Sequence, residues 1–292
     1  MSFVHLHVHS EYSVLDGASK IKGLLKAAEK NGQPALAITD HGNMFGVKEF
    51  LDTAAKMKSP VKPIVGCEVY VAKGHRTEKK GREDQGSYHL ILLAKNMQGY
   101  HNLIKMVSYG WIEGFYYKPR IDHELLEKYH EGIICSSACL GGEIPRAIMN
   151  GDIQRAEELA LWYRSIFGDD YYLEVQRHKT EVPGADASTF EKQQRVNEVI
   201  FQIADKYGIK VIATNDVHFV NKEDGPAHDR LICVSTNADY NDPKRMRYTQ
   251  QEYLKSTEEM IEIFSDHPEV ISNTLEIADK IEKIDLNSDP IL

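Results

Sequence analysis

The sequence predicts an α/β fold in which seven short strands alternate with helices and close into a (β/α) barrel. Short apolar runs alternate along the chain with longer amphipathic stretches, a pattern that is typical of strand–helix repeats and a parallel sheet. Seven such runs favour closure into a barrel over an open sheet. Most of the side chains that could bind a metal fall at the ends of these runs, which indicates a site at one end of the barrel.

The expected strands are the runs richest in Val, Ile and Leu. They span residues 3–8, 35–39, 63–71, 89–94, 132–136, 171–175 and 210–215. Apolar residues recur at helical spacing over residues 19–31, 44–57, 100–109, 152–167 and 189–207. Two polar segments that contain glycine, residues 73–87 and 176–188, are expected to form mobile loops.

The character of the sequence changes after about residue 240. Two amphipathic helices are expected at residues 249–264 and 268–281, and the last residues have the composition of an extended connector. We therefore expect a barrel over residues 1–240. Residues 241–292 would form a short helical extension and a connector to a further part of a longer protein.

Composition excludes several classes of protein. The 292 residues hold 42% hydrophobic and 27% charged side chains, as in an ordinary globular protein, and no apolar run is long enough to cross a membrane. Four cysteines at irregular spacing and the lack of a signal peptide favour the reducing cytoplasm. The net charge of −9 argues against tight DNA binding by this chain alone.

Three histidines alternate in the first expected strand. His5, His7 and His9 share one face of it, because strand side chains alternate with period two. Imidazoles two positions apart, about 7 Å along the strand, can bind one ion. A polar strand end explains this pattern equally well, and His5 lies deepest of the three.

Two further strand ends carry similar side chains. His41 follows the second expected strand, and Asp40 beside it is placed either to orient an imidazole or to cap the next helix. Asp216 and His218 follow the last expected strand, again two positions apart. His89 instead begins its run, so it either faces inward from lower in the barrel or marks a misplaced boundary.

Six ordered motifs extend over much of the chain. They are residues 5–13 (HLHVHSEYS), 15–17 (LDG), 39–44 (TDHGNM), 66–68 (GCE), 139–143 (CLGGE) and 215–218 (NDVH). Together they resemble the polymerase and histidinol phosphatase (PHP) superfamily. Residues 114–120 (GFYYKPR) and 253–256 (YLKS) resemble, within that superfamily, the N-terminal PHP domain of bacterial DNA polymerase III alpha subunits. The resemblance covers essentially the whole chain.

The resemblance implies a distorted seven-stranded (β/α)7 TIM-like barrel that holds two to three divalent metal ions. The first ion would be held by His7, His9, Glu68 and Asp216, the second by Glu68, His89 and Cys139, and the third by Asp16, His41 and His218. Cysteine replaces a histidine of the phosphatase branch at position 139, and a thiolate favours Zn²⁺ over Mn²⁺. The nitrogen and oxygen ligands suit either ion, and Fe²⁺ also fits.

The implied chemistry is hydrolysis of a phosphate diester by a metal-bridging hydroxide. Four negative ligands against three divalent ions leave a positive site that attracts phosphate. Arg120 and His178, together with Arg177, are candidates for phosphate contact or leaving-group assistance, although solvated loop charges are the other interpretation. The catalytic residues that we assign are Asp216, His9, Glu68, Arg120 and His178.

Three hypotheses follow. The first is a metal-dependent phosphoesterase domain of a replicative DNA polymerase, a nucleotidyltransferase, that proofreads DNA 3′ ends as a 3′-5′ exonuclease. The second is a catalytically weak module that scaffolds the polymerase and docks a separate proofreading subunit. The third is a stand-alone histidinol phosphatase, against which the polymerase-type motifs argue. The remaining histidines are expected at the surface or as helix caps: His75, His101, His123, His130, His228 and His267.

Overall fold

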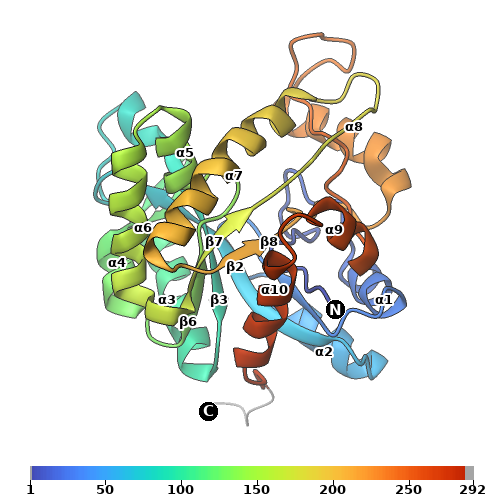
Figure 1. The fold of residues 1–292 in the computed structure, drawn as a ribbon, viewed down its shortest axis with the longest axis horizontal. Coiled ribbons are helices and arrows are strands. Elements are labelled where there is room, and N and C mark those ends of the chain that lie inside the picture. The colour runs from blue at the N-terminus through green and yellow to red at the C-terminus, as the bar shows by residue number, and fades with distance from the viewer. Residues whose placement is uncertain (1, 287–292) are drawn as a thin grey trace.

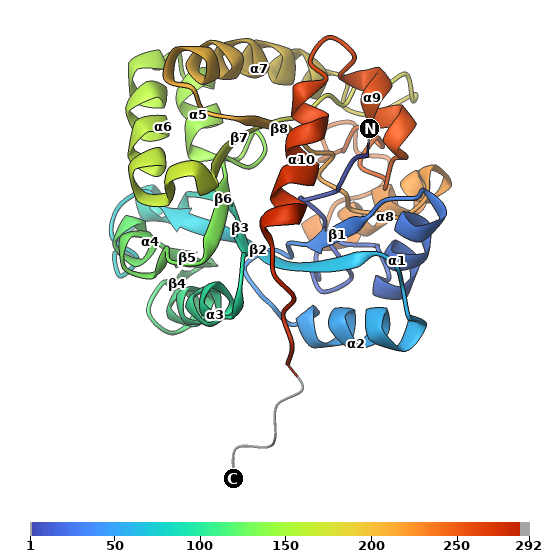
Figure 2. The same ribbon diagram turned by 60° about the horizontal axis from the view of Figure 1, so that its bottom comes forward.

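The computed structural model describes residues 2–286, and its strands form a ring (Figures 1 and 2). All seven expected strand segments are present. Six are regular strands: β1 (Ala35–Ile38), β2 (Lys62–Ala72), β3 (Ser87–Ala94), β6 (Ile133–Ser136), β7 (Tyr171–Val175) and β8 (Val211–Ala213). The N-terminal segment closes the ring through two isolated bridges, from His5 to Leu36 in β1 and from Val8 to Val217 just beyond β8. The predicted distorted seven-stranded barrel is therefore confirmed.

The expectation of a purely parallel sheet is wrong at β3. This strand runs antiparallel to both of its neighbours, β2 and β6, whereas the β1–β2, β6–β7 and β7–β8 pairs are parallel. Residues 73–86, which include the 3₁₀ turn η1 (Arg82–Gln85), return the chain directly from β2 to β3 without a helical crossover. Two short strands that were not expected, β4 (Phe115–Tyr116) and β5 (Lys118–Ile121), extend the sheet beside β2.

The helices cover the outside of the barrel. The five expected ones are α1 (Ile21–Lys30), α2 (Val47–Met57), α3 (Met97–Ile112), α6 (Ile153–Phe167) and α7 (Ser188–Tyr207). Three were not expected: α4 (His123–Tyr129), α5 (Glu143–Met149) and α8 (Gly225–Thr236). Two short 3₁₀ turns, η2 (Gly168–Asp170) and η3 (Lys222–Asp224), complete this part of the chain. None of the helices in residues 2–286 is long and apolar enough to span a membrane.

The C-terminal helices are α9 (Thr257–Ile263) and α10 (Glu269–Lys280). Helix α9 begins eight residues later than expected, because Ser256 caps it. The Ser256 hydroxyl accepts a hydrogen bond from the backbone N–H of Glu259, and the Glu259 carboxylate accepts one from the N–H of Ser256. Residues just before this cap run beside the segment after β8 instead, with a bridge between Tyr253 and Phe219.

The inward-facing side chains of the strands form layers along the barrel axis. The first layer is apolar and buried, and it consists of Ile64, Ile91, Leu93, Ile134, Tyr172 and Ile212. Two positions further along their strands, Ser136, Glu174 and Thr214 form a hydrogen-bonded polar layer. Side chains two positions apart in a strand point to the same side. The inward face of each strand therefore supplies both the apolar layer and the polar layer next to it.

Helix α10 closes the apolar end of the barrel (Figure 2). Ile277 and Ala278 pack in the same cluster as Val4 and Leu6 of the N-terminal segment. The hydroxyl of Thr274 accepts a hydrogen bond from the backbone N–H of Val4, so the helix is fixed to the segment that carries the first histidines.

Candidate metal centre

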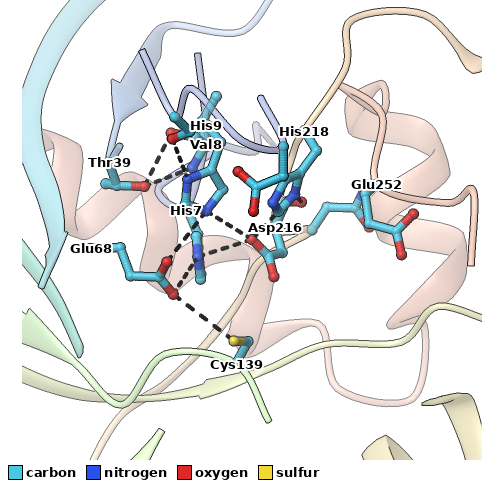
Figure 3. A network of polar contacts seen from close by, with 12 residues as sticks. His7, Val8, His9, Thr39, Glu68, Cys139, Asp216, His218 and Glu252 are labelled. Atoms are coloured by element: carbon cyan, nitrogen blue, oxygen red, sulfur yellow. Dashed lines mark hydrogen bonds and ion pairs between the residues drawn. The ribbon is translucent and has the colours of Figure 1, made fainter. Parts of the chain in front are cut away.

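The nine residues that the sequence nominates as metal ligands lie together at the end of the barrel opposite α10, and Figure 3 shows six of them. Each places a nitrogen, oxygen or sulfur atom within 4.0 Å of such an atom on another member of the set. The set, which we call the ligand cluster, is His7, His9, Asp16, His41, Glu68, His89, Cys139, Asp216 and His218.

The first group of the ligand cluster joins the N-terminal segment to β2 and to the segment after β8. Nε2 of His7 lies 3.3 Å from Oε1 of Glu68 and 3.0 Å from Oδ1 of Asp216. Nε2 of His9 lies 3.1 Å from the same Asp216 oxygen and 3.7 Å from Oε2 of Glu68. Two imidazoles and two carboxylates therefore point at one small volume.

The second group includes the residue whose position the sequence did not explain. His89 lies near the start of β3. Because β3 is antiparallel to its neighbours, its first residues lie beside the C-terminal ends of the other strands. Nδ1 of His89 lies 2.8 Å from Oε1 of Glu68 and 3.7 Å from Sγ of Cys139. Glu68 thus belongs to both groups, one oxygen nearest His89 and His7 and the other nearest His41 and His9.

The third group lies toward the loop at residues 10–17. Nε2 of His41 lies 3.2 Å from Oδ2 of Asp16, and its ring stacks on that of His9 with the centroids 4.0 Å apart. The ring of His218 lies 4.4 Å from that of His9, and the three imidazoles bring one nitrogen each within 4.8 Å of one another. His41 also contacts Glu68 through Nδ1, which links this group to the other two.

Asp216 has a strained backbone that aims its side chain. Its φ of 46° lies in the left-handed region, which is uncommon for a residue with a side chain, although aspartate tolerates it better than most. The preceding residue supplies the restraint, because the amide of Asn215 donates to the backbone carbonyls of Gln251 and Tyr253. The segment before α9 therefore holds this carboxylate in the cluster.

The carboxylates of the cluster are ionised. Burial opposes ionisation of Glu68, but His89 and His41 beside it hold the pKa of that carboxyl well below its usual range. Burial opposes ionisation of Asp216 as well, and His7 outweighs it, so the pKa of Asp216 is also far below its usual range. The cluster is accordingly a negatively charged pocket when no cation is bound.

The imidazoles and the thiol differ in protonation. Burial, followed by repulsion from His41, lowers the pKa of His9 to about 3, so its ring is neutral and keeps a free lone pair. Burial opposes the charged form of His41, but Glu68 and Asp16 prevail and raise its pKa to about 10. Burial raises the pKa of the Cys139 thiol well above its usual range, so a cation is required to make it a thiolate.

Several donor atoms of the cluster are buried and form no hydrogen bond of good geometry among the described residues, although other members of the cluster lie close to some of them. They are Nε2 of His7, Oδ1 of Asp16, Nδ1 of His41, Oε2 of Glu68 and Nε2 of His218. A buried polar atom without a partner is costly, and a bound ion is one way to satisfy it. Nitrogen, carboxylate oxygen and one sulfur suit a borderline divalent ion such as Zn²⁺, so the donor set fits the implied metals.

Glu174 orients His7 through the ring nitrogen that faces away from the ligand cluster. The sequence analysis did not identify this residue. Its Oε1 accepts from Nδ1 of His7 at 2.7 Å, and Ser136, Thr214 and Gln176 donate to the same carboxylate. A carboxylate in this position fixes the tautomer of a ligand histidine. The available signal was a glutamate inside the apolar run at residues 171–175.

Asp40 orients the cluster rather than capping a helix. Its carboxylate accepts from the N–H and hydroxyl of Ser10 and from the hydroxyl of Ser13. Ser13 in turn lies 3.0 Å from Nδ1 of His9, so the network holds this ring in place. Of the two roles proposed for Asp40, the orienting one is correct.

Arg120 was expected to contact phosphate, and the structure contradicts this. It is 1% exposed, and its guanidinium donates to the backbone carbonyls of Gly114, Arg76, Glu78 and Asp84. Because its donors are occupied, this side chain organises the loop between β2 and β3 and does not reach the cluster.

The two other candidates outside the ligand set have structural partners. Arg177 pairs with Asp266 and packs on Phe264, away from the cluster. His178 lies beside Asp216 but is buried, with Nε2 donating to the carbonyl of Asn215 and Nδ1 accepting from Gln193. Its position therefore supports the Asp216 segment rather than a phosphate contact.

Two histidines outside the cluster are buried in addition to His178. His228 was expected at the surface, yet its Nε2 lies 2.9 Å from the backbone carbonyl of Asp16 and its ring packs near that of His218. His5 contacts the backbone carbonyl of Lys255 through Nε2 and takes no part in the cluster. The alternation of the first strand thus yields two ligand candidates and one buried structural histidine.

Comparison with known families agrees with this site. Residues 5–178 match the family model described as the PHP domain. The chain belongs to the PHP domain family. The matched residues include the first seven members of the ligand cluster, from His7 to Cys139, while Asp216 and His218 lie beyond the match.

Curated relatives are DNA polymerase III alpha subunits. The chain is 46% identical to that of Borreliella burgdorferi over 283 residues and 44% identical to that of Treponema pallidum over 283 residues. Each alignment covers 96% of this PHP chain but only 24% and 23% of the relative, so the chain spans about a quarter of their length. A solved amidohydrolase from Chromobacterium violaceum is remotely similar, at 15% identity and a TM-score of 0.43, covering 75% of this chain and 88% of that one.

Proposed function

We propose that this chain is the N-terminal PHP domain of a DNA polymerase III alpha subunit and hydrolyses phosphodiesters with bound divalent metals, as a proofreading 3′-5′ exonuclease. The strongest support is the position of Glu68, whose two oxygens contact members of all three ligand groups. A shared carboxylate is what adjacent metal ions require. The similarity to polymerase alpha subunits supports a DNA 3′ end as the substrate.

The residues of the chain have definable parts in this reaction. His7, His9, Glu68 and Asp216 would hold the first ion, and the burial of the first three would keep bulk water from competing for it. Ions bound here would lower the pKa of coordinated water and stabilise negative charge that develops on a phosphoryl group. The ionised carboxylates balance part of the metal charge, so the loaded site keeps the positive excess that attracts a phosphate.

We propose Zn²⁺ or Mn²⁺ as the ions, with Fe²⁺ as a further ion that the ligands suit. Cys139 favours zinc in the second group, because thiolates prefer softer ions. The third group, with His41, His218 and Asp16, offers only nitrogen and oxygen, so it suits manganese equally.

We also propose the division of the chain that its sequence suggests, with a phosphoesterase barrel over residues 1–240 and an extension over residues 241–292. That extension would continue into the polymerase core, which performs nucleotidyl transfer, and the whole would act in the cytoplasm. The size of the alpha subunits to which the chain is similar supports this arrangement.

The test is the shortening of a primer labelled at its 5′ end by protein supplied with Mn²⁺ or Zn²⁺. His9→Ala and Asp216→Ala should abolish the activity, because each removes a donor from the first group. His101→Ala, at an exposed position on α3, is the matched control and should keep it. Equal degradation by the parent and both site variants would show that a contaminant cuts the DNA and would sink the proposal.

A structural role is the second candidate, and the burial of the cluster favours it. His7, His9 and Glu68 are fully buried, so ions bound to them would cross-link the N-terminal segment to β2. In that case, chelation would lower the melting temperature while DNA stayed intact with every metal. The domain would then serve to organise the polymerase and to dock a separate proofreading subunit.

A further inference from the structure

A cleft of about 840 Å³ opens from the metal centre. Cys139 and Asp216 form the part of its lining that belongs to the ligand cluster. The rest comes from residues 140–141, α5, the loop at residues 176–186, the start of α7 and the loop at residues 243–252. The volume is that of a site for a sizeable ligand. A single phosphate group fills only a small part of it.

The exposed lining of this cleft is cationic, although the chain carries a net charge of −9. Arg146 on α5 and Lys192 on α7 form no ion pair within the described residues, and Arg247 donates only to backbone carbonyls. Arg245 differs, because its charge is balanced by a bidentate pair with Asp229. Three cations without ion pairs therefore lie in a cleft that borders the candidate metal centre and also contains Asp186, Asp216 and Glu252.

The buried lining of the cleft has a free acceptor. Glu252 is 3% exposed, and its Oε1 accepts from Thr249, but its Oε2 has no hydrogen-bond partner among the described residues. Figure 3 shows Glu252 beyond Asp216 and His218, on the side away from Glu68. A carboxylate there repels phosphate but accepts hydrogen bonds from a sugar hydroxyl or a base amino group. Of the two other lining carboxylates, Asp216 belongs to the ligand cluster and Asp186 already accepts hydrogen bonds from Ser188 and Thr189.

We propose that this cleft binds the polynucleotide strand whose terminal phosphodiester lies at the metal centre. Arg146 and Lys192 contact backbone phosphates upstream of the bond that is cut, and Glu252 accepts a hydrogen bond from the terminal nucleotide. The inference rests on the proposed phosphodiester hydrolysis and specifies its substrate as a strand with several phosphates rather than a small monoester.

The experiment measures binding of a fluorescein-labelled DNA strand with phosphorothioates at its 3′ end, so that it resists hydrolysis. Fluorescence anisotropy on the metal-loaded chain is recorded between about 50 and 200 mM salt. The variant Arg146→Gln/Lys192→Gln is compared with Arg195→Gln/Lys206→Gln, which removes the same charge from positions on α7 outside the cleft. Hydrolysis of bis-p-nitrophenyl phosphate, which has one phosphate, reports on the metal centre of each protein.

The cleft variant should bind the strand about tenfold more weakly at the lowest salt. Its slope of log affinity against log salt should fall by about 1.4, since each lost contact with a single strand removes about 0.7. Its rate on the small diester and the binding by the control variant should stay at the parent values. Equal strand affinity and slope in the parent and the cleft variant would overturn the proposal.

The experiment gives different results if the cleft does not bind the strand and if the chain does not hydrolyse phosphodiesters. If the parent hydrolyses the small diester and the cleft variant binds DNA like the parent, strand binding by the cleft is refuted and the hydrolytic function stands. If no metal supports hydrolysis of the small diester or of the 5′-labelled primer while the cleft variant still loses strand affinity, the hydrolytic function is refuted and strand binding by the cleft stands.

Discussion

Nδ1 of His7 donates a hydrogen bond to Oε1 of Glu174 at 2.7 Å. With that proton held on Nδ1, Nε2 faces the ligand cluster and can bind a metal ion once the ion displaces the proton on Nε2. Glu174→Ala should therefore weaken metal binding about 10- to 100-fold. Competition with a chelator measures this, and the exposed Glu158→Ala on α6 is the control. Unchanged affinity would show that Glu174 serves only the barrel interior.

Gly17 holds the loop of the third ligand group by close approach. A Cβ at this position would lie 1.9 Å from the backbone oxygen of Ser10, so the loop that carries Asp16 would have to move. Gly17→Ala should cost about 1–3 kcal/mol of unfolding free energy and reduce the bound metal. At Gly81 a Cβ meets nothing within 4 Å, so Gly81→Ala should be nearly neutral. Similar urea midpoints for the two variants would contradict this account.

Ile277 tests whether α10 belongs to the barrel. It is fully buried and packs with Val4 and Leu6 of the N-terminal segment. Ile277→Ala should lower the unfolding free energy by about 2–5 kcal/mol, as expected for truncation in a core. Denaturant unfolding measures the loss. A loss below about 0.5 kcal/mol, the range of surface substitutions, would mean that the helix is only an appendage.

Lys255 makes stability depend on pH in alkaline solution. Burial, only partly offset by Glu252 and Glu259, lowers its pKa from 10.5 to about 7. Between these values the unfolded chain binds a proton that the folded chain does not, so this lysine makes the protein more stable as pH rises. Over two pH units within that window, the unfolding free energy of the parent should rise by roughly 2–3 kcal/mol relative to that of Lys255→Met.

The outcome for Lys255 is read from urea unfolding at two pH values in the alkaline window. The charge-matched control is Lys26→Met, at an exposed position on α1. A Lys255→Met difference that stays constant with pH, as in the control, would show that the lysine keeps its proton in the folded state.

The sequence sufficed for the ring of strands and for the members of the cluster. Period-two alternation and runs of Val, Ile and Leu identified the seven strands, because burial of a strand produces both sequence patterns. The direction of β3 could not be inferred, since a short apolar run carries no mark of strand direction. His89 was consequently left unexplained until the hairpin-like return at residues 73–86 placed it beside Glu68.

The supporting residues were harder to infer than the ligands. Glu174 and His228 are buried polar residues whose partners in the ligand cluster, His7 and Asp16, lie more than 150 positions away in sequence, so no local pattern identifies them. Arg120 was misassigned because its local sequence pattern suggested the wrong environment. An arginine in a polar loop suggests solvent or phosphate, and only the fold shows that four carbonyls surround it.

The central claim is that the ligand cluster binds divalent metal ions, and the metal content of the purified chain tests it most directly. After free metal is removed by gel filtration, elemental analysis should find about two to three ions of zinc or manganese per chain. His9→Ala and Asp216→Ala should lower that number, because both residues belong to the first group. Fewer than about one ion per parent chain, or unchanged content in both variants, would contradict the account.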